Sequence, residues 1–340
     1  MHAAEQALAE ARGFMKSRVI LTAAALDLFT LLDEEPRSAG ALAQALGLDA
    51  RAAARLLDCL AALGVLAKHD GVLRLTEAGA PYSGRHPQSV LPMLRHLNRL
   101  WDTWSGLTQV VRTGDNPAHT GDHIGGRTGG RTGCAAPDEA SRKAFIQAMH
   151  VVGRDLSEAI ARDFDLSPYR RLLDIGGASG TYTIAFLRHN PAMTACLFDL
   201  PAVLPLARER LDREGLTARV QLAPGDFTTD ALPAGCDLAL LSAIIHQNSP
   251  QQNLELFAKV HTALTPGGVL LIRDHIMDES RTRPPAGALF AINMLVNTPG
   301  GDCYTLREVR EGLEQAGFTN VRQLRQGEAM DCLVQARKPG

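Results

Sequence analysis

A histidine and an aspartate follow two successive apolar runs in the second half of the chain, and together they could remove a proton from a hydroxyl group. His246 comes directly after the run 237–245, and Asp274 closes the run 269–274. Both runs are typical of strands buried on both faces, and parallel sheets bind ligands beyond the carboxyl ends of their strands. An imidazole is a suitable base near neutral pH, and a carboxylate on its other nitrogen fixes its tautomer and orientation. We therefore expect His246 as general base and Asp274 as its orienting partner; the alternative is an ordinary hydrogen-bonded histidine at a strand end.

A glycine turn indicates where a nucleoside-like ligand would bind. The run 171–175 ends in three closely spaced glycines, Gly176, Gly177 and Gly180, before a predicted helix. A strand, a glycine turn and a helix form the first unit of a doubly wound sheet. The next predicted strand ends at Asp199, roughly 20 residues beyond the turn, where a carboxylate reaches ribose hydroxyls. The glycine spacing does not match the G-x-G-x-x-G fingerprint, and no phosphate loop is present, so a nicotinamide reductase is disfavoured.

Several motifs together resemble one known family. The sequences LDIGGASG at 173–180 and FDLP at 198–201 resemble the class I S-adenosylmethionine-dependent methyltransferases. More closely, they resemble the small-molecule O-methyltransferases of the caffeate and acetylserotonin type. The segments 241–249, 273–275 and 294–301 resemble the family segments that carry the catalytic histidine, an orienting carboxylate and the lining of the acceptor pocket. The resemblance covers nearly the whole chain.

The resemblance implies an α/β fold with a Rossmann-like, seven-stranded methyltransferase sheet, mostly parallel with an antiparallel edge, after a mainly helical winged-helix domain. It also implies S-adenosylmethionine as methyl donor and a small hydroxylated metabolite, aromatic or polyketide-like, as acceptor. The residues expected at the donor are Asp174, Gly176, Gly177, Gly180, Asp199, Leu200, Asp226, Phe227 and Ser242, and those expected at the acceptor are Met149, Met294, Asn297 and Thr298.

These residues have different expected roles. Asp199 would accept hydrogen bonds from both ribose hydroxyls, and the glycines would let the backbone approach the amino-acid part of the donor. Asp226 would give adenine a polar contact and Phe227 an apolar face; the less favoured alternative for Asp226 is an ordinary turn residue after a strand. Met149 lies on a predicted helix, 137–164, which by resemblance covers the donor pocket; a core position is its alternative.

Three positions depart from the family pattern. Gln247-Asn248 replaces the Asp-Trp that follows the histidine, Ser242 stands where a lysine often meets the donor, and Asp302-Cys303 stands where plant enzymes carry a second glutamate. The first and third departures leave C- or N-methylation open as alternatives to O-methylation.

Composition limits the other possibilities. The net charge of −2 over 340 residues gives no footprint for nucleic acid or an anionic membrane. The six cysteines form no CxxC pair, and His119, His123 and Cys134 lie in a glycine-rich run, so we expect no metal site and disfavour a metal-dependent methyltransferase. The amino terminus has no secretory pattern and the apolar stretch 19–32 is too short for a bilayer, so we expect a cytoplasmic protein.

The chain divides into three predicted parts: a winged-helix-like dimerisation domain at 1–112, a glycine-rich linker at 113–136 and a methyltransferase domain at 137–340. A winged helix can bind DNA or support a dimer. DNA binding needs a basic surplus, but acidic residues balance the arginines of the second predicted helix, 50–63. The Ala- and Leu-rich residues 3–32 favour a homodimer without a nucleic-acid partner. A DNA-binding regulator that senses S-adenosylmethionine remains the non-enzymatic alternative.

Overall fold

The computed structural model describes residues 3–115 and 139–340. The predicted loop residues His119, His123 and Cys134 lie outside the described residues, as does most of the predicted linker. The chain forms two compact units, Met1–Trp101 with Lys143–Val151, and Asp102–Arg142 with Val152–Gly340. Because of this division, α5 (Leu91–Ser105) and α8 (Glu139–Asp163) each contribute residues to both units.

The first unit contains the predicted winged helix. Its elements are α1 (Ala3–Ala25), α2 (Leu28–Glu34), β1 (Arg37–Ser38), α3 (Ala39–Leu46), α4 (Ala50–Ala62), β2 (Leu66–His69) and β3 (Val72–Leu75). The Ser38 and Asp49 side chains cap α3 and α4 by accepting hydrogen bonds from backbone N–H groups. Asp70 and Gly71 both have positive φ, which suits the tight turn of the β2–β3 hairpin. The short β1 pairs with β3, so the hairpin becomes a three-stranded sheet.

The second unit contains the predicted sheet. Its strands are β4 (Arg171–Ile175), β5 (Thr194–Asp199), β6 (Val220–Pro224), β7 (Cys236–Ser242), β8 (Leu264–Asp274), β11 (Thr319–Arg325) and β12 (Cys332–Arg337). Their order is β11-β12-β8-β7-β4-β5-β6. All neighbours are parallel except β12, which is antiparallel to β8 and to β11. This topology confirms the predicted seven-stranded sheet with an antiparallel edge.

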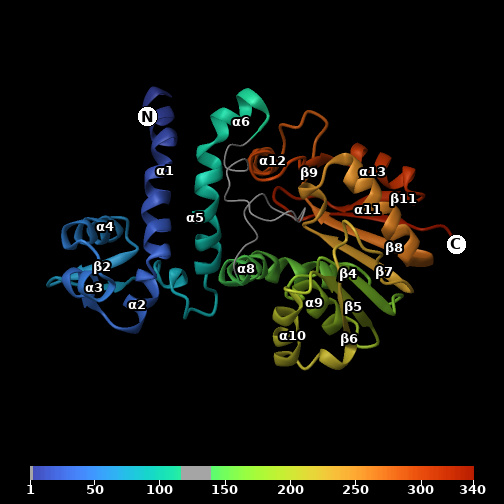
Figure 1. Cartoon of the computed structure of the whole chain (residues 1–340), viewed down its shortest axis with the longest axis horizontal. Helices are drawn as coiled ribbons and strands as arrows, with labels where there is room; N and C mark the ends of the chain where they lie inside the picture. The colour runs from blue at the N-terminus through green and yellow to red at the C-terminus, as the bar shows by residue number, and fades with distance from the viewer. Residues whose placement is uncertain (1–2, 116–138) are drawn as a thin grey trace. The chain divides into compact units, whose positions relative to one another are not determined.

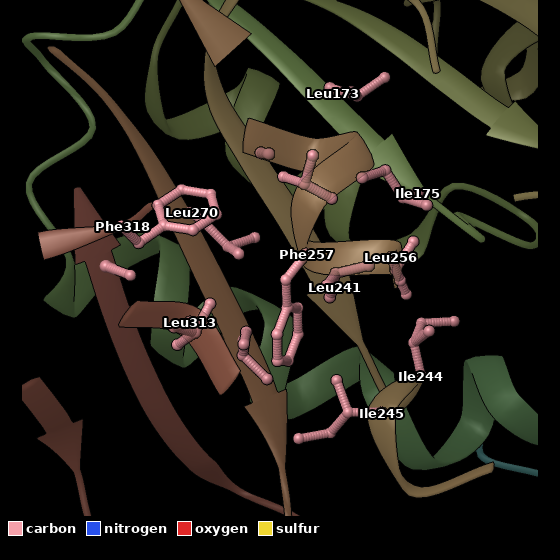
Figure 2. Packing of buried hydrophobic residues seen from close by; sticks show 14 of the residues in the cluster. Leu173, Ile175, Leu241, Ile244, Ile245, Leu256, Phe257, Leu270, Leu313 and Phe318 are labelled. Atoms are coloured by element: carbon pink, nitrogen blue, oxygen red, sulfur yellow. The ribbon is translucent and has the colours of Figure 1, made fainter. Parts of the chain in front are cut away.

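Helices cover both faces of this sheet (Figure 1). The helices that lie wholly in the second unit are α6 (Leu107–Thr113), α9 (Thr181–His189), α10 (Leu204–Arg213), α11 (Pro250–Ala263), α12 (Pro285–Asn297) and α13 (Leu306–Gln315). A separate two-stranded sheet of β9 (Ile276–Met277) and β10 (Tyr304–Thr305) flanks α12. One core cluster joins the strands to α11 and α13, and Figure 2 shows Phe257 and Leu313 of these helices packed beside strand residues. A second cluster joins the opposite face to α8, α9 and α10.

The strand before the predicted base ends earlier than expected. The apolar run 237–245 predicts a strand up to Ile245, but β7 ends at Ser242. Ala243 has a φ of 59°, and a 3₁₀ turn follows at Ile245–Gln247. Ile244 and Ile245 are buried in the core cluster, so their apolar character reflects packing in a turn and not a continued strand. His246 therefore lies in a rigid turn beyond the strand end.

No described helix is long and apolar enough to cross a membrane.

Candidate active site

The structure brings His246 and Asp274 into direct contact. β7 and β8 are neighbouring parallel strands with Ser242 opposite Arg273, so their carboxyl ends meet at one edge of the sheet. The His246 Nδ1 atom lies 2.9 Å from Asp274 Oδ1 and 3.0 Å from Oδ2. The aspartate side chain is 1% exposed and that of the histidine 12%. The ring of Phe290 on α12 stands edge-on to the imidazole, with 4.9 Å between centroids.

Asp274 is buried and yet remains ionised at neutral pH. Burial alone would raise the pKa of its carboxyl, but His246 and, less strongly, Arg273 outweigh burial and hold that pKa below its usual range. The His275 N–H also donates to Asp274 Oδ1 at 2.8 Å. An ionised carboxylate only accepts hydrogen bonds, so Nδ1 of a neutral His246 carries the ring proton. The Nε2 lone pair is then the basic site of the ring.

Three elements hold the turn that carries His246. Asn253 on α11 donates to the Ile245 carbonyl at 2.9 Å and accepts from the side chain of Asn248 at 3.0 Å. The Tyr304 hydroxyl donates to the Asn248 carbonyl, and the Asp302 N–H donates to the His246 carbonyl at 2.9 Å. Asn248, which stands where the resemblance leads us to expect tryptophan, is thus buried with its side-chain amide bonded to Asn253 and its backbone carbonyl bonded to Tyr304. Neither partner was predicted from the sequence.

The glycine turn packs closely against the sheet. A Cβ atom on Gly177 would lie 2.7 Å from Leu197 and 2.9 Å from the Asp174 carboxylate, so only glycine fits there. Asp199, at the end of β5, accepts from the Ala178 N–H at 2.8 Å and from the Leu200 N–H at 2.7 Å. Its carboxylate is thus held at the turn, as expected of a residue that binds ribose.

Asp174 contacts the first turn of α9. Its carboxylate accepts from the Thr183 hydroxyl at 2.6 Å and is 2% exposed. Burial, with a smaller contribution from the charge of Asp199, raises the pKa of Asp174 to about 6. The described contacts make Asp174 a brace for the turn; its contact with the donor remains a prediction.

The predicted adenine contacts lie in a self-bonded turn after β6. Asp226 Oδ1 accepts from the N–H and hydroxyl of Thr228, at 2.8 and 2.7 Å. Lys259 on α11 donates to the carbonyls of Phe227, Thr228 and Asp230. The Phe227 side chain is 2% exposed and belongs to the first core cluster. Both residues therefore have structural partners, and their contact with adenine remains a prediction.

Buried hydroxyls lie around the same turn. Ser179 Oγ has no hydrogen-bond partner among the described residues, and the Tyr182 hydroxyl lies beside the Ser242 hydroxyl without a hydrogen bond of normal geometry. Buried polar groups in proteins are normally satisfied, so these hydroxyls fit a polar ligand at the glycine turn. With the fixed carboxylate of Asp199, the residues present are chemically suited to S-adenosylmethionine.

The predicted acceptor residues on α12 are hydrogen-bonded to their surroundings. Asn297 accepts from the Thr103 hydroxyl at 2.7 Å and donates to the Asn293 carbonyl at 2.8 Å. Trp104 Nε1 donates to Asn293 Oδ1 at 2.9 Å. Thr103 and Asn293 were not predicted from the sequence, although Asn293 and Asn297, four residues apart on one helix face, were a usable signal.

The remaining acceptor predictions are not brought together by these contacts. The hydroxyl of Thr298 donates to the Met294 carbonyl and accepts from the Gly301 N–H, both at 2.8 Å, so it closes the end of α12. Met294 itself is 6% exposed. Met149 belongs to the first compact unit, and its place beside the acceptor remains a prediction.

Asp302 does not place its carboxylate on His246. Its side chain forms an ion pair with Arg281 at 2.9 Å and is 42% exposed. Arg281 also pairs with Glu308. Asp302 therefore acts on the histidine through its backbone N–H alone. Within residues 3–115 and 139–340, no group of three or more acidic, histidine or cysteine side chains could hold a metal ion.

Comparison with known proteins identifies two family domains. The O-methyltransferase domain family matches residues 104–319, and the O-methyltransferase dimerisation domain family matches residues 9–83. A tetracenomycin polyketide synthesis 8-O-methyltransferase of Streptomyces glaucescens is 34% identical over 332 residues, covering 96% of this chain and 94% of the relative. Acetylserotonin O-methyltransferase of Gallus gallus is 32% identical over 334 residues, covering 95% and 94%.

A solved structure supports the same relationship. Human N-acetylserotonin methyltransferase, in complex with S-adenosylmethionine, superposes with a TM-score of 0.85 at 26% identity. The match covers 100% of this chain and 99% of the human chain.

Proposed function

The chain belongs to the O-methyltransferase family and is an S-adenosylmethionine-dependent methyltransferase, and we propose that it methylates a hydroxyl group of a small aromatic or polyketide-like metabolite. The observation that carries this proposal is the buried His246–Asp274 pair. Relatives named for a polyketide and for acetylserotonin support the acceptor class. The dimerisation domain supports a homodimer.

The donor, when bound, supplies an activated methyl group on a sulfonium. The chain's own residues bind and align it. The Asp199 carboxylate, held by the Ala178 and Leu200 N–H groups, accepts from the ribose hydroxyls. The close-packed turn at Gly177 brings backbone next to the amino-acid part of the donor. Alignment of two reactants is itself a large part of catalysis, because it replaces a bimolecular encounter.

His246 activates the acceptor. Its Nδ1 proton is held by Asp274, so Nε2 would take the proton of the acceptor hydroxyl. The acceptor oxygen would bond to the methyl carbon as the bond between that carbon and sulfur breaks, which leaves S-adenosylhomocysteine. Asp274 stabilises the imidazolium that forms, because its carboxylate stays ionised. A positioned base of this kind contributes typically about 10²–10⁴-fold in rate. The Phe290 ring packs edge-on against the imidazole from the α12 side and so supports its orientation.

A screen of acceptors tests the function directly. The protein is incubated with methyl-labelled S-adenosylmethionine and a panel of phenols, naphthols, hydroxyquinones and matched aryl amines. We expect label in methyl ethers of one hydroxyaromatic class, with NMR showing the new methyl group on oxygen. Label on carbon or nitrogen would contradict O-methylation while leaving methyl transfer intact.

Donor binding has a separate test. Asp199→Ala removes the charge-assisted hydrogen bonds to the ribose, and losing them costs roughly 1.5–3 kcal/mol. We expect the Kd of S-adenosylmethionine, measured by calorimetry, to rise by about 10- to 150-fold. Asp70→Asn, in the exposed turn of the β2–β3 hairpin, is a control that removes a carboxylate far along the chain and keeps Asp199 and its N–H partners. Unchanged affinity in a folded Asp199→Ala variant would remove Asp199 from the donor site.

A further inference from the structure

Arg273 is a buried cation at the ligand-binding edge of the sheet. It lies on β8, it is 6% exposed, and it faces Ser242 on β7. Its Nε and Nη2 atoms donate to Ser242 Oγ at 3.0 and 2.9 Å, and Nη1 donates to the Met330 carbonyl at 3.0 Å. A guanidinium has more N–H donors than these three bonds use. Arg273 therefore has donors left for a ligand.

The described residues give this cation no carboxylate in an ion pair. Buried charges in proteins are almost always paired, because an isolated buried charge is strongly destabilising. Asp274 is the next residue on the strand, but both of its oxygens bond to His246, and one also accepts from the His275 N–H. The hydrogen-bond partners of Arg273 are a hydroxyl and a carbonyl, which are neutral. Asp274 is thus the nearby anion, but its oxygens are engaged by His246 and His275, and no carboxylate of the described residues bonds directly to the guanidinium.

The cation lies next to the glycine turn. Its guanidinium carbon is 5.2 Å from the ring centroid of Tyr182, in the first turn of α9. Ser242 ends β7, the neighbour of the strand that leads into the glycines. Ser179 Oγ is buried there without a hydrogen-bond partner among the described residues, and the buried Tyr182 hydroxyl lies beside the Ser242 hydroxyl without a hydrogen bond of normal geometry. A guanidinium without a directly bonded carboxylate and two buried hydroxyls therefore border the part of the site expected to hold the donor's amino-acid end.

We propose that Arg273, together with Ser242 and Tyr182, binds the α-carboxylate of S-adenosylmethionine. Arginine binds carboxylates well because its planar N–H groups match the two carboxylate oxygens. Ser242 stands where the family often has a lysine, so the neighbouring strand supplies the positive charge that position 242 lacks. Ser242 accepts two N–H groups and thereby fixes the plane of the guanidinium. This inference rests on the donor site of the proposed function.

A comparison of two ligands isolates the carboxylate contact. S-Adenosylhomocysteine carries the α-carboxylate, whereas 5′-S-(3-aminopropyl)-5′-thioadenosine is the same molecule without it. Calorimetry gives both Kd values for the wild type, for Arg273→Met and for Arg273→Lys. Arg307→Met is the control variant. It makes the same substitution at an exposed arginine of α13. Circular dichroism and thermal melting verify that each variant is folded.

We expect the wild type and Arg307→Met to prefer S-adenosylhomocysteine by about 10- to 150-fold, as for a charged hydrogen-bonded contact. Arg273→Met should reduce this preference to about threefold or less and leave the Kd of the aminopropyl compound nearly unchanged. Arg273→Lys keeps the charge and should retain an intermediate preference, and it provides the test if Arg273→Met does not fold.

An undiminished preference in either folded Arg273 variant overturns the inference. A wild type that binds both compounds equally overturns it too, while donor binding stands; a wild type that binds neither removes the proposed function as well.

Discussion

Two buried aspartates at the site have opposite pKa shifts, and their neighbours explain the difference. Asp274 lies against His246 and beside Arg273, which hold the pKa of its carboxyl below the usual range. Asp174 has only the Thr183 hydroxyl as partner and also faces the negative charge of Asp199, so its pKa rises to about 6. Asp274 therefore stays charged, as the proposed role of His246 as base requires. The pKa of Asp174, at about 6, lies close to neutral pH, so mild acidification protonates this residue.

The shift of Asp174 makes stability depend on pH. An aspartate in the unfolded chain titrates at about 3.9, whereas Asp174 in the folded protein titrates at about 6. Between these values the folded state holds the extra proton, so the free energy of unfolding falls as pH rises through this window. We expect Asp174→Asn to gain about 2–4 kcal/mol relative to the wild type between about pH 4 and pH 7.

Urea unfolding at several pH values measures this difference. Asp70→Asn, in the exposed turn of the β2–β3 hairpin, is the control and should show no such trend. A stability difference between Asp174→Asn and the wild type that stays constant with pH would show that Asp174 does not titrate in the window.

The contact between His246 and Asp274 was predictable from the sequence because each lies at the end of an apolar run, and successive runs of this kind become neighbouring strands. The residues that hold the histidine turn could not be predicted in this way. Asn253, Tyr304 and Asp302 reach it from positions up to 56 residues away along the chain, and a polar residue on a helix shows no sequence signal of the carbonyl it will meet. The folded backbone alone determines these pairs.

At the level of elements, α11 connects the two predicted halves of the site. Its amino-terminal end holds the histidine turn through Asn253, and Lys259, two turns later, holds the turn with Asp226 and Phe227. Ser249 and Gln252 begin this helix with a capping box. Ser249 followed by Pro250 is a signal of the start of α11 that can be read in the sequence, because capping is a local interaction. The strand end before it is wrong by three residues, because buried isoleucines look alike in a strand and in a turn.

We expect Asn253→Leu to loosen the histidine turn. The substitution leaves the Ile245 carbonyl and the Asn248 amide buried without their partner, at about 1–3 kcal/mol for each unsatisfied group. The free energy of unfolding should fall by an amount in this range, and kcat should fall while the Kd of the donor stays the same. Gln251→Leu, on the exposed side of the same helix, should change neither. A variant that is destabilised but keeps the wild-type kcat would show that the turn does not need Asn253 for catalysis.

At the level of the whole molecule, the predicted dimer depends on the first helix. Leu8, Phe14 and Met15 of α1 are each more than half exposed, which is unusual for large apolar side chains on one helix. They lie in or beside the segment that matches the dimerisation domain family. The described residues of the first unit bury a core of their own, so these three side chains are not needed to complete it.

We expect sedimentation of the full chain at micromolar concentration to show a dimer. Replacing Leu8, Phe14 and Met15 together by glutamine should shift the protein towards monomer while circular dichroism remains unchanged. Leu324→Gln, an exposed apolar residue on β11, serves as control and should stay dimeric. A full chain that sediments as a monomer would contradict the predicted homodimer.

The most direct test of the whole account is the rate of methyl transfer by His246→Ala, measured as a function of pH with a phenolic acceptor found in the screen. We predict a rate about 10²–10⁴-fold below the wild type at neutral pH, with the Kd of S-adenosylmethionine nearly unchanged. The variant should regain activity as the pH approaches the acceptor's own pKa, about 10 for a simple phenol, because the acceptor then ionises without a base. His189→Ala, on the exposed end of α9, should behave as the wild type. Full turnover by a folded His246→Ala variant at neutral pH would contradict the central claim that His246 is the base.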